Sequence, residues 1–295
     1  MRKIQQVTNT TTMVIMDSDE IKQLIKESVD VILTNTISES KIDDLLTSHK
    51  IKPHFVPIRY RIFYSHLHSL NIQFGSFIQM LVHKVLEKES FIEMIPIISG
   101  KRISLSWSRE VDTLIDNFIM EHRNKTDENL DYNFEVLQED IIMKQLFGTN
   151  LITSSQDVDI LFRDRRDDIM YYIEVKYNED YDNNNFIGIN RKFLKTYAGL
   201  VKLLDITDIT KLKPILYFFT KKTKKINVCI PEESHVYRGE MIFDRFSSTK
   251  YDDITTCLKN ISEDYNIIET FDNLYVKIRY MEQHNMVNHG NSNFR

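Results

Sequence analysis

Cysteine and glycine are scarce in this chain of 295 residues, and each scarcity excludes a class of protein. The two cysteines, Cys229 and Cys257, are too few for a disulfide framework and lack the spacing of a metal site. The seven glycines never fall in a G-x-G or G-x-x-x-x-G-K pattern, so a dinucleotide fingerprint and a P-loop are absent. We therefore expect a protein of a reducing compartment that does not use these nucleotide-binding motifs.

Long hydrophobic runs and a strong charge of either sign are also missing. The first twenty residues contain no apolar signal-peptide core, and no run approaches the length of a membrane span. The net charge of −5 gives no general attraction to nucleic acid, although it is compatible with a local basic surface. With 42% hydrophobic residues the composition is that of an ordinary globular protein. We expect a cytoplasmic protein that binds no membrane.

Composition and pattern divide the chain into four parts. Residues 1–18 are rich in threonine and aperiodic, which is typical of a mobile arm, and residues 19–70 show the apolar period of a helical region. Residues 71–231 alternate between helical and strand patterns, with a helical insertion at about 106–147. Residues 232–295 form a mixed C-terminal region that ends in a polar tail. This order predicts an α/β or α+β fold.

The stretch SQDVDILFRDRRDDIMYYIEVKYNED has the alternation of two strands joined by a charged turn. Tyr172, Glu174 and Lys176 share one face of the second strand. If the turn is symmetric about the Arg166–Asp167 bond, Asp159 lies directly across from Glu174. A slip of one residue in this register would point Asp159 away, so the pairing is an expectation for the structure to test.

Two carboxylates that face each other at such short range repel unless a cation lies between them. A divalent ion that prefers oxygen ligands suits this arrangement, Mg²⁺ first among them, with the Val175 carbonyl as a further ligand. Lys176 lies one pleat beyond Glu174 on the same face. The residues Asp159, Glu174 and Lys176 therefore indicate a centre that hydrolyses a phosphodiester, in which Lys176 orients the nucleophile or steadies the transition state.

Asp159, an apolar strand and Glu174-Val175-Lys176 together resemble the PD-(D/E)XK motif of restriction-enzyme-like nucleases. The stretches IEVKYN, INRKFLKTYAGL and IPEESHVYRGEMIFDRF, in this order, also resemble type II restriction endonucleases of the HinfI and TdeIII kind. The resemblance runs from about residue 74 to 246 and is weakest between 95 and 148. It implies a restriction-endonuclease-like core, with a mixed central β-sheet flanked by helices and additional helical segments.

The resemblance also implies an activity and partners. We expect a Mg²⁺-dependent type II restriction endonuclease that cuts both strands of double-stranded DNA at a short palindromic site, such as the interrupted sequence GANTC. A cognate DNA methyltransferase is expected in the same system without stable contact. Cutting both strands of a palindrome favours a homodimer. The surfaces proposed for it are the helices near residues 20–33 and 109–122, or the segment after Pro231, with preference for the helices.

The sequence departs from the family pattern at two places. No proline precedes Asp159 or the nearby Asp157, which is an alternative metal ligand or a group that supports one. Gln79 stands where many relatives carry a helical glutamate that supports the metal, and Glu87 is a poor substitute for it.

Basic residues that follow the motif are candidates for phosphate contacts, and each has a plainer interpretation as a solvated surface group. They are Arg191, Lys192, Lys195, Lys221, Lys222, Lys224 and Lys225. Glu174 and Lys176 likewise have a plainer interpretation as a salt bridge on an exposed sheet. Two other functions remain open on sequence alone: a nuclease of the same core used in repair or junction resolution, and a DNA-binding scaffold without enzymatic activity.

Overall fold

The computed structural model describes residues 18–122, 129–177, 183–221 and 229–290. The expected arm at 1–18 therefore lies outside the described residues, apart from Ser18 at the start of a helix. Lys222, Lys224 and Lys225 lie outside them as well. The chain forms two compact units. We call residues 82–249 the sheet unit, and residues 17–81 together with 250–295 the helical unit.

A five-stranded mixed sheet forms the centre of the sheet unit, in the order β1-β4-β5-β6-β7. The three strands at one side pair antiparallel: β1 (Ile92–Met94), β4 (Ile160–Asp164) and β5 (Ile169–Lys176). The strands at the other side, β6 (Leu212–Phe218) and β7 (Val236–Arg238), continue parallel to β5. The helix α6 (Asn183–Leu203) connects β5 to β6, as a parallel pair requires. The predicted mixed sheet with flanking helices is confirmed.

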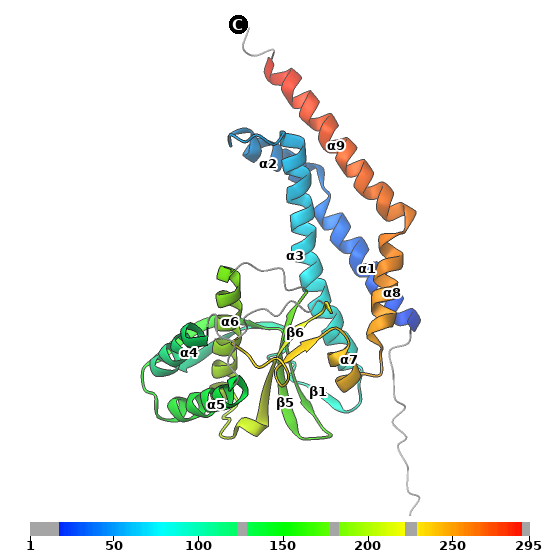
Figure 1. The fold of residues 1–295 in the computed structure, drawn as a ribbon. Coiled ribbons are helices and arrows are strands. Elements are labelled where there is room, and N and C mark those ends of the chain that lie inside the picture. The colour runs from blue at the N-terminus through cyan, green and yellow to red at the C-terminus, as the bar shows by residue number, and fades with distance from the viewer. Residues whose placement is uncertain (1–17, 123–128, 178–182, 222–228, 291–295) are drawn as a thin grey trace, which may run out of the picture. The chain divides into compact units, whose positions relative to one another are not determined.

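Both faces of the sheet are covered, which explains why β5 is almost continuously apolar (Figure 1). On one face Tyr172 of β5 stacks on Phe193 of α6. On the other face Phe246, at the end of α7 (Met241–Phe246), packs edge-on against Phe162 and Tyr171. A short 3-10 turn, η1 (Ile209–Lys211), precedes β6.

A separate two-stranded ribbon pairs β2 (Lys101–Ser108) with β3 (Leu151–Val158). Along the chain, the two helices of the expected insertion follow β2 and precede β3: α4 (Arg109–His122) and α5 (Leu130–Phe147). Buried Gln145 of α5 joins the pieces, because its amide accepts from the Ser108 N–H and donates to the Ala198 carbonyl of α6. The ribbon and both helices are thereby fixed to the sheet unit beside α6.

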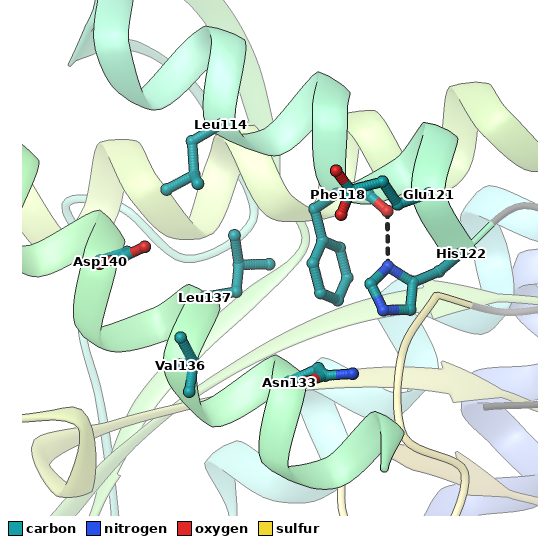
Figure 2. Close-up of a pocket in the computed structure, with 8 residues that line it drawn as sticks. All are labelled: Leu114, Phe118, Glu121, His122, Asn133, Val136, Leu137 and Asp140. Carbon is teal, nitrogen blue, oxygen red and sulfur yellow. Dashed lines mark hydrogen bonds between the residues drawn. The ribbon is translucent and has the colours of Figure 1, made fainter. Parts of the chain in front are cut away.

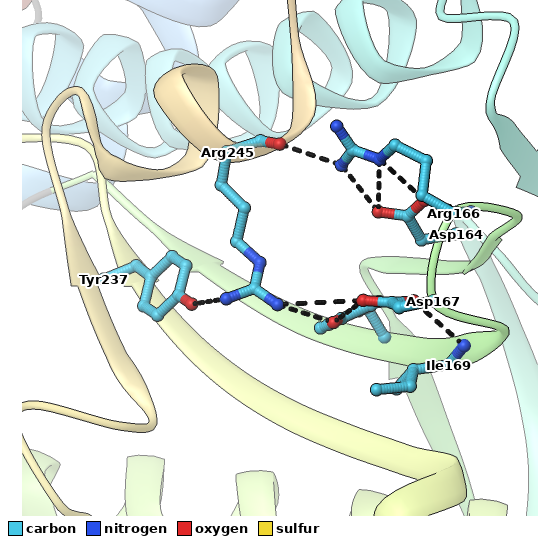
Figure 3. Close-up of polar contacts among 7 residues, drawn as sticks. Asp164, Arg166, Asp167, Ile169, Tyr237 and Arg245 are labelled. Carbon is cyan, nitrogen blue, oxygen red and sulfur yellow. Dashed lines mark hydrogen bonds and ion pairs between the residues drawn. The ribbon is translucent and has the colours of Figure 1, made fainter.

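A network of polar contacts fastens the turn between β4 and β5 to α7 and β7 (Figure 3). Arg166 binds buried Asp164 through both of its oxygens and donates to the carbonyl of Arg245. The Arg245 guanidinium donates to the hydroxyls of Tyr237 and Tyr171. This network surrounds the turn that precedes β5, whereas Glu174 lies near the other end of that strand. It therefore fixes the hairpin at its turn.

The helical unit contains α1 (Ser18–Thr36), α2 (Glu39–Lys50), most of α3 (Ile58–Glu87), α8 (Tyr251–Ser262) and α9 (Tyr265–Gly290). One hydrophobic cluster of this unit is formed by Ile42, Leu46, Ile62, Leu274 and Ile278, so residues from early and late parts of the chain pack together. α3 begins directly after Pro57, and α9 continues through part of the stretch expected to be a polar tail. No helix in the described part of the chain combines the length and apolar composition needed to cross a bilayer.

Candidate active site

Asp159 and Glu174 face each other across the β4–β5 hairpin, in the register expected from the sequence. Ile160 pairs with Ile173 and Asp164 with Ile169, which places Asp159 one step beyond, opposite Glu174. The strands close on a short turn in which Asp168 adopts a positive φ of 58°, a conformation that aspartate tolerates better than most residues. The Oδ2 atom of Asp159 accepts a hydrogen bond of 2.9 Å from the Val175 N–H, which fixes its carboxylate against β5.

Three side chains donate to the buried carboxylate of Glu174. Lys176 and Lys192 each place Nζ 2.6 Å from Oε1, and the Tyr172 hydroxyl donates to Oε2 over 2.9 Å. Lys192 also approaches Asp159, with 3.8 Å between its Nζ and Oδ1. The site therefore holds two carboxylates and two ammonium groups, which come from β5, α6 and the residue before β4.

The two carboxyl groups differ in their pKa. Burial and the charge of Glu174 raise the pKa of Asp159 to about 7, against the opposing effect of Lys192 and Lys176. Burial also acts to raise the pKa of Glu174, but Lys176 and Lys192 outweigh it and hold that pKa below its usual value. One carboxylate is thus firmly ionised, while the other requires more positive charge nearby to ionise fully at neutral pH.

The donor set suits a hard divalent cation. The carboxylates of Asp159 and Glu174 and the carbonyl of Val175 are all oxygen ligands, the kind that Mg²⁺ prefers. Among the residues that the structure describes, no three acidic, histidine or cysteine side chains come together as a possible metal site. Two side chains and a main-chain oxygen form the candidate site here, and water and phosphate oxygens are the usual remaining ligands of Mg²⁺.

The other proposed metal-supporting residues differ in exposure from this buried pair. Asp157 lies on the solvent side of β3, with its side chain 55% exposed and 3.9 Å from Arg102. Glu87 is exposed near the end of α3, where its charge acts on His83. Gln79 is half-buried in α3, within the helical unit.

The proposed phosphate contacts have acidic neighbours in the sheet unit. Arg191 pairs with Asp116 at 2.8 Å, and Lys195 pairs with Asp112 at 2.6 Å, so both basic groups of α6 bind carboxylates of α4. Lys221 lies 3.1 Å from Glu240. Lys192 differs from these, because its partners are the two candidate catalytic carboxylates.

Sequence reasoning named Lys192 as a phosphate contact and missed its place in the site. The spacing alone does not reveal this place, which becomes clear only from the burial of a neighbouring residue. Thr196 is fully buried and lies one helical turn after Lys192, so both belong to the side of α6 that faces the sheet. Tyr172, which the sequence places on the same face of its strand as Glu174, is fully buried, and its hydroxyl holds Glu174.

A pocket between α4 and α5 is distinct from this site (Figure 2). Apolar side chains of Leu114, Phe118, Val136 and Leu137 line it together with polar groups, and His122 donates to the Phe118 carbonyl over 2.8 Å. None of the candidate catalytic residues lines this pocket.

Comparisons with known proteins agree with the resemblance read from the motif. The family described as "Type II restriction endonuclease, HinfI" matches residues 17–262. The chain is also similar to the type II restriction enzyme HinfI of Haemophilus influenzae. The two are 41% identical over 266 residues, which cover 90% of this chain and 100% of that protein. No solved structure gives a significant match.

Proposed function

Because this chain belongs to the HinfI family of type II restriction endonucleases, we propose that Asp159, Glu174 and Lys176 form its catalytic centre. The protein is a site-specific endonuclease, and its substrate is double-stranded DNA. Four finer features of this function are proposed. They are the metal, the residues that bind it, the DNA site and the assembly.

The observation that carries the proposal is the buried carboxylate pair. Glu174 is fully buried and Asp159 is 4% exposed, although their charges repel. Buried ionised groups are costly unless they are paired, bind metal or perform chemistry, so a merely structural role would be better filled by apolar residues. In a nuclease family, a pair of this kind at the end of two central strands is best explained as a cation site.

Type II restriction endonucleases generally use a divalent metal, and we assign Mg²⁺ to the carboxylates of Asp159 and Glu174 and the Val175 carbonyl. When bound, the ion supplies positive charge to the phosphate and makes water a better nucleophile. The Val175 N–H holds the Asp159 carboxylate, and the Tyr172 hydroxyl holds that of Glu174. Both carboxylates are therefore oriented before DNA binds, which reduces the reorganisation needed in the reaction.

Lys176 is assigned to the attacking water and the phosphate. Its ammonium lies at the end of β5, 20% exposed, and contacts Glu174 at 2.6 Å. A lysine held there orients the nucleophile and stabilises the charge that develops on the phosphate oxygens. The close pairing with Glu174 fixes the direction of the ammonium.

The proposed DNA site is short and palindromic, possessing the GANTC-like form that the family resemblance implies. A palindrome is read most economically by two copies of one chain related by its own two-fold axis, so a homodimer is proposed. A cognate DNA methyltransferase that protects the same site is proposed for the host, without stable contact with this protein.

The first prediction concerns the carboxylates. Purified protein with plasmid DNA and Mg²⁺ should give discrete fragments, and Asp159→Asn and Glu174→Gln should each abolish cleavage. DNA binding in Ca²⁺ should survive, because Ca²⁺ occupies oxygen sites with less strict geometry. Gel electrophoresis and a binding titration provide both measurements.

Asp157→Asn is the matched control, since Asp157 is exposed and faces Arg102. It should cut as the unaltered protein does. Full cleavage by Asp159→Asn together with loss of cleavage by Asp157→Asn would transfer the ligand role to Asp157. A smear in place of discrete fragments would indicate a nuclease without site preference, and no cleavage at all would favour a DNA-binding scaffold.

A further inference from the structure

Lys192 stands between the two proposed metal ligands. Its Nζ atom lies 2.6 Å from Oε1 of Glu174 and 3.8 Å from Oδ1 of Asp159. The residue comes from α6, outside the Glu-x-Lys triplet of β5, and the family motif gives it no role. A divalent cation held by Asp159 and Glu174 would have to compete with this ammonium for the two carboxylates.

An ammonium in this position has a clear electrostatic effect. The two carboxylates repel each other, and Lys192 places its ammonium 2.6 Å from an oxygen of Glu174 and 3.8 Å from an oxygen of Asp159. At such distances in a protein interior, an opposite charge attracts a carboxylate strongly. Together with Lys176 at Glu174, Lys192 thus supplies positive charge that lets the two carboxylates remain close without a metal.

Resting on the catalytic centre proposed above, we infer that Lys192 is a positioning residue that acts as the internal counter-ion of the Asp159–Glu174 pair and gives way to the divalent cation. In the protein without DNA the ammonium competes with the cation for the two carboxylates. Cation binding is therefore weak until Lys192 has another partner.

The phosphate backbone of DNA provides that partner. The Lys192 side chain is 31% exposed, and lysine is a flexible point charge that binds phosphate readily. A phosphate oxygen that draws the ammonium away frees the carboxylates for the cation. DNA binding and cation binding then strengthen each other through one side chain, as thermodynamic linkage requires of any such coupling.

The test measures Ca²⁺ binding to the full-length protein without DNA, by isothermal titration calorimetry. At about pH 8.5, above the pKa of about 7 for Asp159, competition from protons is small. Lys192→Met should bind Ca²⁺ at least about tenfold more tightly than the unaltered protein, because the competing charge is gone. Its melting temperature should be lower without Ca²⁺ and should rise more when Ca²⁺ is added.

Lys195→Met is the matched control. It removes the same charge from the same helix, one turn away, but Lys195 pairs with Asp112 and Asp116. It should change Ca²⁺ affinity by no more than about twofold, the size of a screened long-range effect. An equal gain in both variants would show that the effect is one of net charge, and the inference would be wrong.

Glu174→Gln separates this inference from the proposed function. If Glu174→Gln abolishes Ca²⁺ binding while Lys192→Met leaves it unchanged or weaker, the metal site stands and the counter-ion role of Lys192 is refuted. If neither the unaltered protein nor Lys192→Met binds Ca²⁺, the carboxylate pair is no cation site and both ideas fail. Lys192→Gln provides a second uncharged variant should Lys192→Met fail to fold.

Discussion

At the scale of single residues, the two lysines at Glu174 have separable tasks. Both contact the same oxygen at 2.6 Å, but Lys192 also approaches Asp159, while Lys176 lies on the strand that ends at the site. Because Lys192 and Tyr172 still satisfy Glu174 when Lys176 is removed, the fold does not depend on Lys176. The reaction, by contrast, requires a charge at that position.

Lys176→Met should therefore reduce the rate of the cleavage step by at least about a hundredfold, the usual loss for a positioned charge or proton-transfer group. The melting temperature should change little. Single-turnover cleavage and thermal melting measure the two effects. A large drop in melting temperature with an unchanged cleavage rate would establish the salt-bridge interpretation instead.

His235 gives a pH dependence that is independent of the catalytic centre. Burial lowers the pKa of His235 to about 4, although its Nδ1–H donates to the Pro214 carbonyl over 2.7 Å. In the unfolded chain the ring takes up a proton near its ordinary pKa of 6.5, whereas the folded protein resists this down to about 4. The unfolded state thus binds more protons between these values, and stability falls as the pH falls through them.

The contribution of His235 to the free energy of unfolding should accordingly be lost between about pH 6.5 and 4, so stability should fall less, or rise more, over this range in His235→Gln than in the unaltered protein. Urea titrations at several pH values provide the measurement. His284→Gln, which alters an exposed histidine of α9, should leave the slope as it is. An identical slope in His235→Gln and the unaltered protein would contradict the assignment.

The sequence predicts part of the site because that part depends on local geometry. Alternation and a symmetric turn are enough to set Asp159 opposite Glu174, and the structure confirms that register. The partners of Arg191 and Lys195 could not be found in this way, since Asp116 and Asp112 belong to a helix inserted between distant strands. The place of Lys192 depends on how α6 packs on the sheet, which no spacing within the helix determines alone.

At the scale of secondary structure elements, the contact of α6 with the β2–β3 ribbon depends on a glycine. A Cβ added to Gly199 would lie 2.7 Å from Cβ of Leu105, closer than real side chains approach. The small residue lets helix and ribbon meet directly. The apolar period predicts α6 itself, but the sequence does not reveal which strand passes over its glycine.

Gly199→Ala should destabilise the protein by about 1–3 kcal/mol, as overpacking of a core does. Gly188→Ala is the control in the same helix, where nothing lies within 4 Å of the added Cβ. That change should be neutral or stabilise the protein by up to about 1 kcal/mol, because alanine favours a helix. Urea unfolding of both variants measures the two changes in stability. Equal stabilities would contradict the close contact of Gly199 with Leu105.

The strand at one edge of the sheet shows where pattern reasoning fails. β7 is three residues long and lies in the stretch HVYRGE, after the boundary at 231 that composition suggested for the core. So short a strand has no alternation to detect. It is held by pairing with β6 and by the hydrogen bond from the Arg245 guanidinium to the Tyr237 hydroxyl. The sheet unit consequently extends to Thr249.

At the scale of the whole molecule, a homodimer is the proposed active form. Among the surfaces named from the sequence, the segment after Pro231 contains an exposed apolar stripe on α9, formed by Ile268, Val276 and Tyr280. These residues are separated by multiples of four, so they share one side of the helix. Exposed apolar patches of this kind mark interaction surfaces, and the proposed catalytic residues are all in the other unit.

Light scattering should detect a complex of two chains of 35.1 kDa on one cognate duplex in Ca²⁺. Val276→Glu should weaken this assembly, because it buries a charge in an apolar contact. Met143→Glu on α5, which is similarly exposed, should not affect it. A single chain on the duplex, with nicked DNA accumulating during cleavage, would contradict the dimer.

The division of the chain into units has a consequence for biosynthesis. α1 packs against α8, and α2 packs against α9. Two helices that are synthesised early can therefore pack only when helices that are synthesised late have emerged from the ribosome. Residues 82–249 are synthesised in between, which takes on the order of ten to thirty seconds at ordinary elongation rates. The sheet unit can thus fold during translation before α8 and α9 exist, whereas the helical unit is completed only after these two helices have left the ribosome. Any assembly through α9 consequently follows the synthesis of the sheet unit.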